Sequence, residues 1–212
     1  GVAPDLIHLT GNTVVDALRW MAPRCRLAPL KKLLGTRLQQ RLLLVTCHRR
    51  ENLGEPMLAV ARALRAVARA HPEAVILLPL HPNPRVRELL RPILTPQDNV
   101  VVCEPLDYDT FLTCLRHAYL VLSDSGGVQE EATALGKPVL VLRQETERQE
   151  GVRAGALRLV GTDEKLIIRE CDRLLTEPTA HARMCRASDV FGDGQAAERI
   201  VRILEATLAA TS

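Results

Sequence analysis

Six short apolar runs divide the chain, and longer segments of mixed apolar and polar residues lie between them. The runs cover residues 41–46, 75–80, 99–103, 119–123, 138–142 and 157–160. Each run is almost continuously apolar, which is typical of strands that are buried on both faces of a parallel sheet. Strands of this kind that alternate with helices predict an α/β fold with a doubly wound parallel sheet.

The segments between the runs predict the helices. Residues 55–70 repeat apolar side chains at helical spacing, which indicates an amphipathic helix. We also expect helices over residues 14–21, 85–90, 107–117, 126–136, 164–175, 180–186 and 195–209, and a looser basic helix over residues 30–40. The final helix carries an apolar stripe at helical spacing, formed by Ile200, Ile203, Leu204 and Leu208.

Polar clusters follow four of the predicted strands. They comprise residues 48–51, His81, residues 125–127 and residues 143–148. In open parallel sheets, ligands bind outside the carboxyl ends of the strands. Four polar clusters at the same edge therefore predict a ligand site there.

The turn after the fourth strand suits an anion. The strand ends in Asp124, and then Ser125, Gly126 and Gly127 lead directly into a helix-forming run. Ser125 is a suitable N-cap residue, and the two glycines, which lack a Cβ, let another molecule approach the backbone closely. Free N–H groups and the positive end of the helix dipole attract a phosphate. An ordinary tight turn between a strand and a helix is the alternative interpretation.

Three other side chains could complete such a site. Arg148 could clamp a diphosphate, because a guanidinium matches phosphate oxygens in pairs; alternatively, it is a solvated arginine paired with Glu147 or Glu150. Glu131 could accept hydrogen bonds from ribose hydroxyls, or it is an ordinary surface residue of the helix. His48 could donate to a phosphate or stabilise a leaving group near neutral pH, although a loop histidine without such a role is the simpler interpretation.

Composition narrows the classes of protein. The 212 residues, 47% of them hydrophobic and with a net charge of +3, fit one large or two small domains. No apolar run approaches the ~18 residues of a membrane span, and the first ten residues lack the pattern of a secretion signal. Two Phe and two Tyr are too few for a base-stacking platform, so nucleic acid is not an expected partner. The six cysteines form no CxxC pair, so we expect reduced thiols, no metal site and a cytoplasmic location.

Several motifs, taken together, resemble one enzyme family. They are CHRREN at residues 47–52, HPNPRVR at 81–87, DSGGVQEEA at 124–132, GKPVL at 136–140, TER at 146–148 and GDGQA at 192–196. In this order they resemble the bacterial non-hydrolysing UDP-N-acetylglucosamine (UDP-GlcNAc) 2-epimerases, and GNTVVD at residues 11–16 is similar to the hinge of that family. The resemblance covers almost the whole chain. The hydrolysing relatives have a different sequence at the turn of residues 125–131.

The resemblance implies a GT-B-type fold of two Rossmann-like domains, of which this chain matches the C-terminal half. It implies a hinge segment over residues 1–29, a UDP-binding Rossmann-like domain over 30–194, and a C-terminal helix over 195–212 that crosses towards the N-terminal domain. We therefore expect part of the stripe on the final helix to be exposed to solvent, paired with another chain or packed on this domain. The carboxylates that are expected to act as acid and base belong to the N-terminal domain, which the match does not include.

The resemblance also implies roles for individual residues. A diphosphate would be held by Ser125, Gly126 and Gly127, with Arg148 and with His48 on the leaving-group side. Glu131 would bind the ribose and the backbone near Phe111 the uracil, whereas Arg49 and His81 would belong to a neighbouring second UDP-GlcNAc site. The chain departs from the family at Gln149, where proline is usual, and this leaves the loop around Arg148 less restrained.

The implied reaction converts UDP-GlcNAc to UDP-ManNAc by elimination of UDP and its re-addition, without a cofactor. UDP-GlcNAc and UDP would be the ligands, and the full-length family implies a homodimer. We expect this chain to supply the nucleotide-binding half and to be inactive without the N-terminal domain. A non-catalytic UDP-GlcNAc-binding module and a GT-B glycosyltransferase domain are the two alternatives.

Overall fold

The computed structural model describes residues 1–186 and 189–211, and it contains the parallel sheet that the sequence predicts. The strands, in chain order, are β1 (Arg41–Thr46), β2 (Ala74–Pro79), β3 (Val100–Cys103), β4 (Ala118–Ser123), β5 (Val139–Val141) and β6 (Leu157–Leu159). They are arranged as β3-β2-β1-β4-β5-β6, and every neighbouring pair is parallel. The strand order reverses between β1 and β4, so the carboxyl ends of these two strands border the crevice where such sheets bind ligands.

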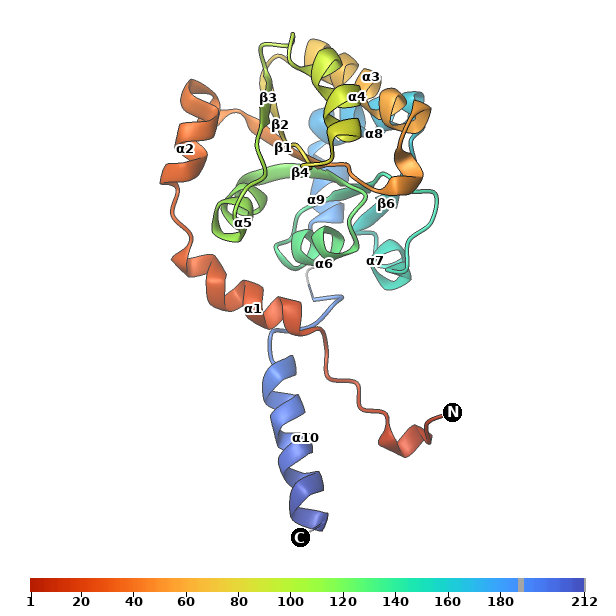
Figure 1. Ribbon diagram of the computed structural model, residues 1–212. Helices are drawn as coiled ribbons and strands as arrows, with labels where there is room; N and C mark the ends of the chain where they lie inside the picture. Colours follow the sequence, from red (N-terminus) through yellow and green to blue (C-terminus); the bar gives the residue numbers. More distant parts are fainter. Residues whose placement is uncertain (187–188, 212) are drawn as a thin grey trace.

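Helices cover both faces of this sheet (Figure 1). One face packs against α3 (Glu55–Ala70), α4 (Pro84–Leu94), α8 (Glu164–Thr176) and α9 (Pro178–Met184). The other face packs against α1 (Thr13–Met21), α2 (Ala28–Leu34), α5 (Tyr108–His117) and α6 (Gly126–Ala134). Side chains of β1 alternate between the two cores, Leu43 on the first face and Leu42 and Leu44 on the second. Burial on both faces explains why the runs in the sequence are continuously apolar.

Three helices differ from the sequence prediction. The helix predicted over residues 30–40 is α2, which ends at Leu34, and a 3-10 helix (Gly35–Gln39) follows it. The helix predicted over residues 85–90 continues through Pro92 to Leu94, because Val86, Leu90 and Leu94 form one buried face. A short helix that was not predicted, α7 (Gln149–Arg153), follows β5. Five residues are too few to show a helical periodicity in the sequence. This helix lies in the segment between β5 and β6, after the carboxyl end of β5.

The last helix, α10 (Ala196–Thr211), projects away from the sheet and its covering helices (Figure 1). In its apolar stripe, Leu204 is 55% exposed and Leu208 is 67% exposed. Leu6, Ile7 and other apolar side chains near the N-terminus are exposed as well. Of the three outcomes expected for this stripe, the structure shows exposure to solvent. The domain boundaries at residues 29 and 194 and the crossing of this helix towards another domain stay predictions. No helix in the described part of the chain is long and apolar enough to cross a membrane.

Candidate functional site

A buried carboxylate fastens together the ends of β1 and β4. Asp124 is 0% exposed, and its Oδ2 accepts hydrogen bonds from the backbone N–H groups of His48 and Arg49, both at 2.8 Å, and from Asn52 Nδ2 at 3.2 Å. These three donors come from the loop after β1, 72 to 76 residues away in the chain. A buried carboxylate needs such partners. Asp124 therefore fixes the position of the His48–Arg49 loop beside the start of α6.

The first turn of α6 lacks the side-chain cap that the sequence predicts. Ser125 does occupy the N-cap position, but its side chain makes no capping hydrogen bond in the described structure; its N–H instead donates to Ser123 Oγ at 3.0 Å. The N-cap residues of α1, α4, α5 and α8 do accept such bonds. The capping prediction was thus wrong for the Ser125 hydroxyl. Because α6 has no internal cap, the N–H groups of its first turn remain available to a ligand.

Arg148 lies directly against this first turn. A Cβ placed on Gly126 would lie 2.9 Å from the guanidinium carbon of Arg148, whereas a Cβ on Gly127 would meet no atom within 4 Å. The open side of the turn is therefore at Gly127, and the cation is beside it at Gly126. This placement brings together the predicted phosphate turn and the predicted arginine clamp, although Gln149 replaces the usual proline.

Glu130 is the partner of Arg148, and the sequence prediction missed it. Its Oε1 accepts from Arg148 Nε at 2.8 Å and lies 2.7 Å from Nη2, while Glu147 Oε2 is 3.4 Å from Nη1. The alternative prediction of a pair with Glu147 is therefore correct only in part, because the closer carboxylate is Glu130. No local signal separates Glu130 from Glu131, since both follow the same glycines on one helix.

The loop that carries Arg148 is held by a second buried contact. Thr146 Oγ1 donates to Gln129 Oε1 at 2.6 Å and accepts from the backbone N–H of Arg148 at 3.2 Å. Gln149 Nε2 donates to the carbonyl of Thr146 at 2.6 Å. Gln149 thus supplies a hydrogen bond within the loop, which replaces part of the restraint that a proline would give.

Glu131 points to a different neighbour. Its Oε1 accepts from the Tyr108 hydroxyl at 3.0 Å. Burial raises the pKa of Glu131, and burial together with the nearby Glu131 charge raises the pKa of Tyr108 to about 12. The phenol therefore remains a donor at neutral pH, and Glu131 is a half-buried acceptor one helical turn beyond Gly127.

A cavity of about 230 Å³ lies beside the loop after β1. His48, His81, Phe111 and Val128 are among its lining residues. The rings of His48 and His81 stack with their centroids 5.2 Å apart, and His48 Nδ1 lies 3.5 Å from Asp124 Oδ1. Three of the predicted site residues thus share one cavity. Arg49 is turned inward, with its Nε donating to the carbonyl of Asp124 at 3.2 Å.

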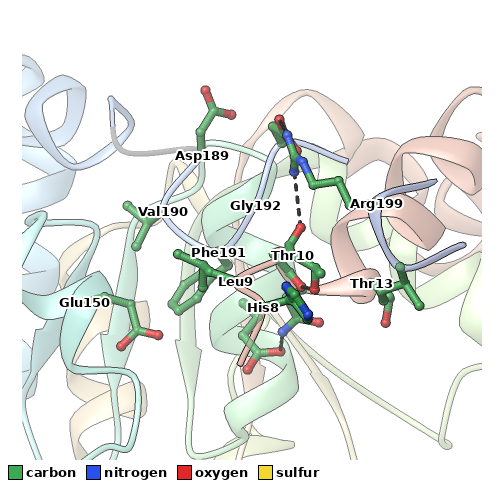
Figure 2. Close-up of a pocket in the computed structure, with 15 residues that line it drawn as sticks. His8, Leu9, Thr10, Thr13, Glu150, Asp189, Val190, Phe191, Gly192 and Arg199 are labelled. Atoms are coloured by element: carbon green, nitrogen blue, oxygen red, sulfur yellow. Dashed lines mark hydrogen bonds and ion pairs between the residues drawn. The ribbon is translucent and has the colours of Figure 1, made fainter. Parts of the chain in front are cut away.

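A larger hollow of about 860 Å³ lies where the N-terminal segment meets the segment before α10. Figure 2 shows its lining, with Arg199 donating to the carbonyl of Thr10 at 3.1 Å and with Phe191, Gly192 and Glu150 around it. Glu130 also lines this hollow, so it lies between the N-terminal segment and Arg148. No group of three or more potential metal ligands occurs among the residues that the structure describes.

Comparison with known proteins agrees with this geometry. The profile of a family described as UDP-N-acetylglucosamine 2-epimerase matches residues 1–205. The chain belongs to this family. A UDP-N-acetylglucosamine 2-epimerase of Yersinia pestis is 44% identical over 96% of this chain, and the match covers 56% of that relative. The chain thus spans about half the length of the curated relatives it matches.

Solved structures of the epimerase family have the same fold. A Staphylococcus aureus structure described as MnaA with UDP is 36% identical, with a TM-score of 0.92 over 99% of this chain and 56% of that one. A Neisseria meningitidis UDP-GlcNAc 2-epimerase bound to UDP-GlcNAc is also 36% identical, with a TM-score of 0.87 over 96% of this chain and 56% of that one. The expected fold, a Rossmann-like parallel sheet that forms half of a GT-B-type structure, is confirmed.

Proposed function

We propose that these 212 residues form the nucleotide-binding half of a UDP-GlcNAc 2-epimerase. The observation that carries the proposal is the uncapped first turn of α6 at the β1/β4 switch point, with the Arg148 guanidinium against Gly126. Family membership supports it, as do the related structures that contain UDP or UDP-GlcNAc. A location in the cytoplasm and a homodimeric full-length enzyme are further parts of the proposal, which rest on the family resemblance.

The chemistry explains why a diphosphate site matters in such an enzyme. Eliminating UDP from the sugar develops negative charge on the leaving diphosphate, and preoriented N–H donors and cations stabilise charge of this kind. The turn of Ser125, Gly126 and Gly127 would supply the N–H donors and Arg148 the cation. His48 would assist on the leaving-group side, where Asp124 holds the backbone N–H of His48 at 2.8 Å and so fixes the position of this residue. UDP would remain bound until it adds back to the sugar.

The remaining contacts concern recognition of the nucleotide. Glu131 would accept hydrogen bonds from the ribose hydroxyls, in place of or beside the Tyr108 hydroxyl that it binds in this structure. The backbone near Phe111, at the edge of the 230 Å³ cavity, would contact the uracil. Arg49 and His81 would contribute to a second UDP-GlcNAc site, and the stacking of His81 on His48 would place the two sites side by side.

Calorimetry with UDP tests the nucleotide site in the 212-residue chain. We expect binding of UDP that is weaker by about 10- to 100-fold in Arg148→Met, because a charge-assisted pair with the diphosphate is lost. Arg153→Met is the matched control, since Arg153 is an exposed arginine of the same loop region. Equal affinity of the wild type and Arg148→Met for UDP would remove Arg148 from the site.

Turnover is tested by exchange of the C2 proton of UDP-GlcNAc in deuterated water. We expect no exchange with the 212 residues alone, because a missing acid or base costs ~10²- to 10⁴-fold each. The N-terminal domain of a family relative, supplied in trans, should restore part of the exchange. Family-like exchange by these residues alone would show that the proton-transfer groups lie within them. Transfer of the sugar to an added acceptor would favour the glycosyltransferase alternative.

A further inference from the structure

Glu130 uses both of its carboxylate oxygens to join two distant segments. Oε1 receives Arg148 Nε and Nη2 at 2.8 and 2.7 Å, and Oε2 accepts from Asn12 Nδ2 at 2.9 Å. The Glu130 side chain is only 12% exposed. A carboxylate as buried as this one needs hydrogen-bond or ion-pair partners for both oxygens. The contacts with Arg148 and Asn12 therefore fix the Glu130 side chain from both sides.

The Arg148 contact fixes one edge of the guanidinium. Because Nε and Nη2 are committed to Glu130, the side chain has little freedom to rotate away from Gly126, where its central carbon lies 2.9 Å from the position of an added Cβ. Nη1 is paired with Glu147 Oε2 at 3.4 Å, and the Glu147 side chain is 54% exposed. Because Glu130 holds the other two nitrogens more closely, Nη1 is the donor that a ligand would reach by displacing Glu147.

The Asn12 contact reaches the hinge segment. Asn12 is the N-cap of α1, where its Oδ1 accepts from the N–H of Val14 at 3.0 Å, and its own N–H donates to the carbonyl of Phe191 at 2.9 Å. One residue thus connects α1, the segment before α10 and, through Glu130, the arginine beside the phosphate turn.

We propose that Glu130 is a positioning residue of the diphosphate site, which holds Arg148 against the first turn of α6 and couples that position to the hinge through Asn12. This inference rests on the proposed UDP site. It adds to that site a carboxylate that would position Arg148 without contacting the ligand. If Glu130 acted only through its charge, its removal would leave a more positive site and would strengthen the binding of an anion. A positioning role predicts instead that removing the Glu130 charge weakens UDP binding.

Glu130→Gln tests the sign with almost no change in shape. Glutamine has one acceptor oxygen, so it cannot accept from both Arg148 and Asn12 as the carboxylate does. We expect UDP affinity, measured by calorimetry, to fall about tenfold. Glu150→Gln is the matched control, because Glu150 is exposed and lines the same hollow, so its substitution removes the same charge at a side chain that does not hold the Arg148 guanidinium. Its UDP affinity should be unchanged or slightly higher.

A reciprocal exchange tests the coupling to the hinge. In Glu130→Gln with Asn12→Asp, the glutamine amide can donate to the carboxylate introduced at position 12 while its oxygen accepts from Arg148, and that carboxylate still caps α1. We expect this double variant to regain UDP affinity to within about threefold of the wild type. A purely electrostatic role also brings this variant back to wild-type affinity, because its net charge equals that of the wild type, but from tighter and not from weaker binding in Glu130→Gln. The direction of the change between the single and the double variant therefore separates the two roles.

The Arg148→Met background separates this inference from the proposed function. If Glu130 acts through Arg148, Glu130→Gln should leave UDP affinity unchanged there. Unchanged or tighter UDP binding by Glu130→Gln alone, no recovery in the exchange variant, or an undiminished effect in the Arg148→Met background would each overturn the positioning role. If the wild type binds no UDP, the diphosphate site itself is wrong; if the wild type and Arg148→Met bind UDP equally, Arg148 is not part of that site. Circular dichroism and the thermal midpoint of each variant establish that it is folded.

Discussion

Two polar regions of the molecule use similar residues but differ in whether their donors are paired within the chain. The first, the cradle, is the turn of Ser125, Gly126 and Gly127 with Arg148. The second, called the hinge clamp after the predicted hinge, comprises residues 10–16 and 191–199. In the cradle, the helix start has no side-chain cap, and the space beyond Gly127 is open. In the hinge clamp, Asp16 accepts from the N–H groups of Ala196 and Ala197 at 3.2 and 2.9 Å, and so caps α10 from another helix.

The arginines of the two regions also differ in how closely the chain pairs their donors. Arg199 forms a two-pronged pair with Asp193, at 2.7 and 2.6 Å, and also donates to the carbonyl of Thr10. Arg148 is held closely by Glu130, at 2.7 Å from Nη2, whereas its Nη1 has a longer contact of 3.4 Å with the 54% exposed side chain of Glu147. The hinge clamp satisfies its charges within the chain, which suits a joint between segments. The cradle leaves donors open, which suits a ligand.

The largest expected effect concerns the open glycine of the cradle. Gly127→Val should lower UDP affinity about 10- to 100-fold, because the branched side chain fills the space that a diphosphate would occupy. The thermal midpoint should not fall, since a Cβ at this position meets no protein atom within 4 Å. Calorimetry and thermal unfolding measure the two quantities.

Ala197→Val is the control for that experiment. Ala197 is the second residue of α10, as Gly127 is the second residue of α6, and it is exposed in the hinge clamp. The same bulk at this position should leave UDP affinity unchanged. Similar losses in both variants would mean that added bulk at a helix start acts on the fold and that the cradle has no special role.

At Gly192, one of the glycines of the hinge clamp, we expect a loss of stability and little change in UDP affinity. Gly192 has a φ of +142°, and a Cβ there would lie 3.1 Å from the backbone nitrogen of Asn12. Gly192→Ala should therefore destabilise the protein by about 1–3 kcal/mol through backbone strain, with a small change in UDP affinity. Chemical denaturation measures the loss, and amide exchange in α1 shows whether it begins at the hinge clamp. A stable Gly192→Ala variant that fails to bind UDP would contradict the division between the two regions.

The sequence predicts the fold more completely than it predicts these contacts. The apolar runs place β1 at residues 41–46 and the other strands within a residue or two of their ends, because burial on both faces leaves a local pattern. The exposed Leu204 and Leu208 also follow from a stripe that the family resemblance assigns to an interface. Local patterns are sufficient where burial decides the structure.

Long-range polar contacts leave no such pattern. Asp16 and Ala196 are 180 residues apart, and nothing near either residue indicates that one caps the other. Glu130 and Glu131 are neighbours in the same motif, yet one faces Arg148 and Asn12 while the other faces Tyr108. The choice depends on where the loop after β5 and the hinge segment pack, which only the folded structure determines.

The smallest expected effect is a pH dependence confined to the hinge clamp. The Arg199 side chain lowers the pKa of Asp193 from 3.8 to about 2. A lowered carboxyl pKa in the folded state contributes stability that is fully present above the unfolded pKa and is lost as the pH falls through the folded pKa. The contribution of this pair should therefore be constant above pH 4 and disappear between about pH 3.8 and 2. It should be small, because both side chains are about 41% exposed.

Urea denaturation of the wild type and Asp193→Asn at several acidic pH values measures this contribution. The wild type should be the more stable at pH 5, and the difference should shrink as the pH falls below 4, because protonated Asp193 resembles asparagine. UDP affinity at neutral pH should be equal in the two proteins, since Asp193 is paired within the hinge clamp and does not contact Arg148 or Glu130 in the hydrogen bonds described above. A difference in stability that stays constant with pH would show that Asp193 acts through its shape alone. A loss of UDP affinity would instead connect the two regions through Arg199 and Thr10, a path independent of Glu130.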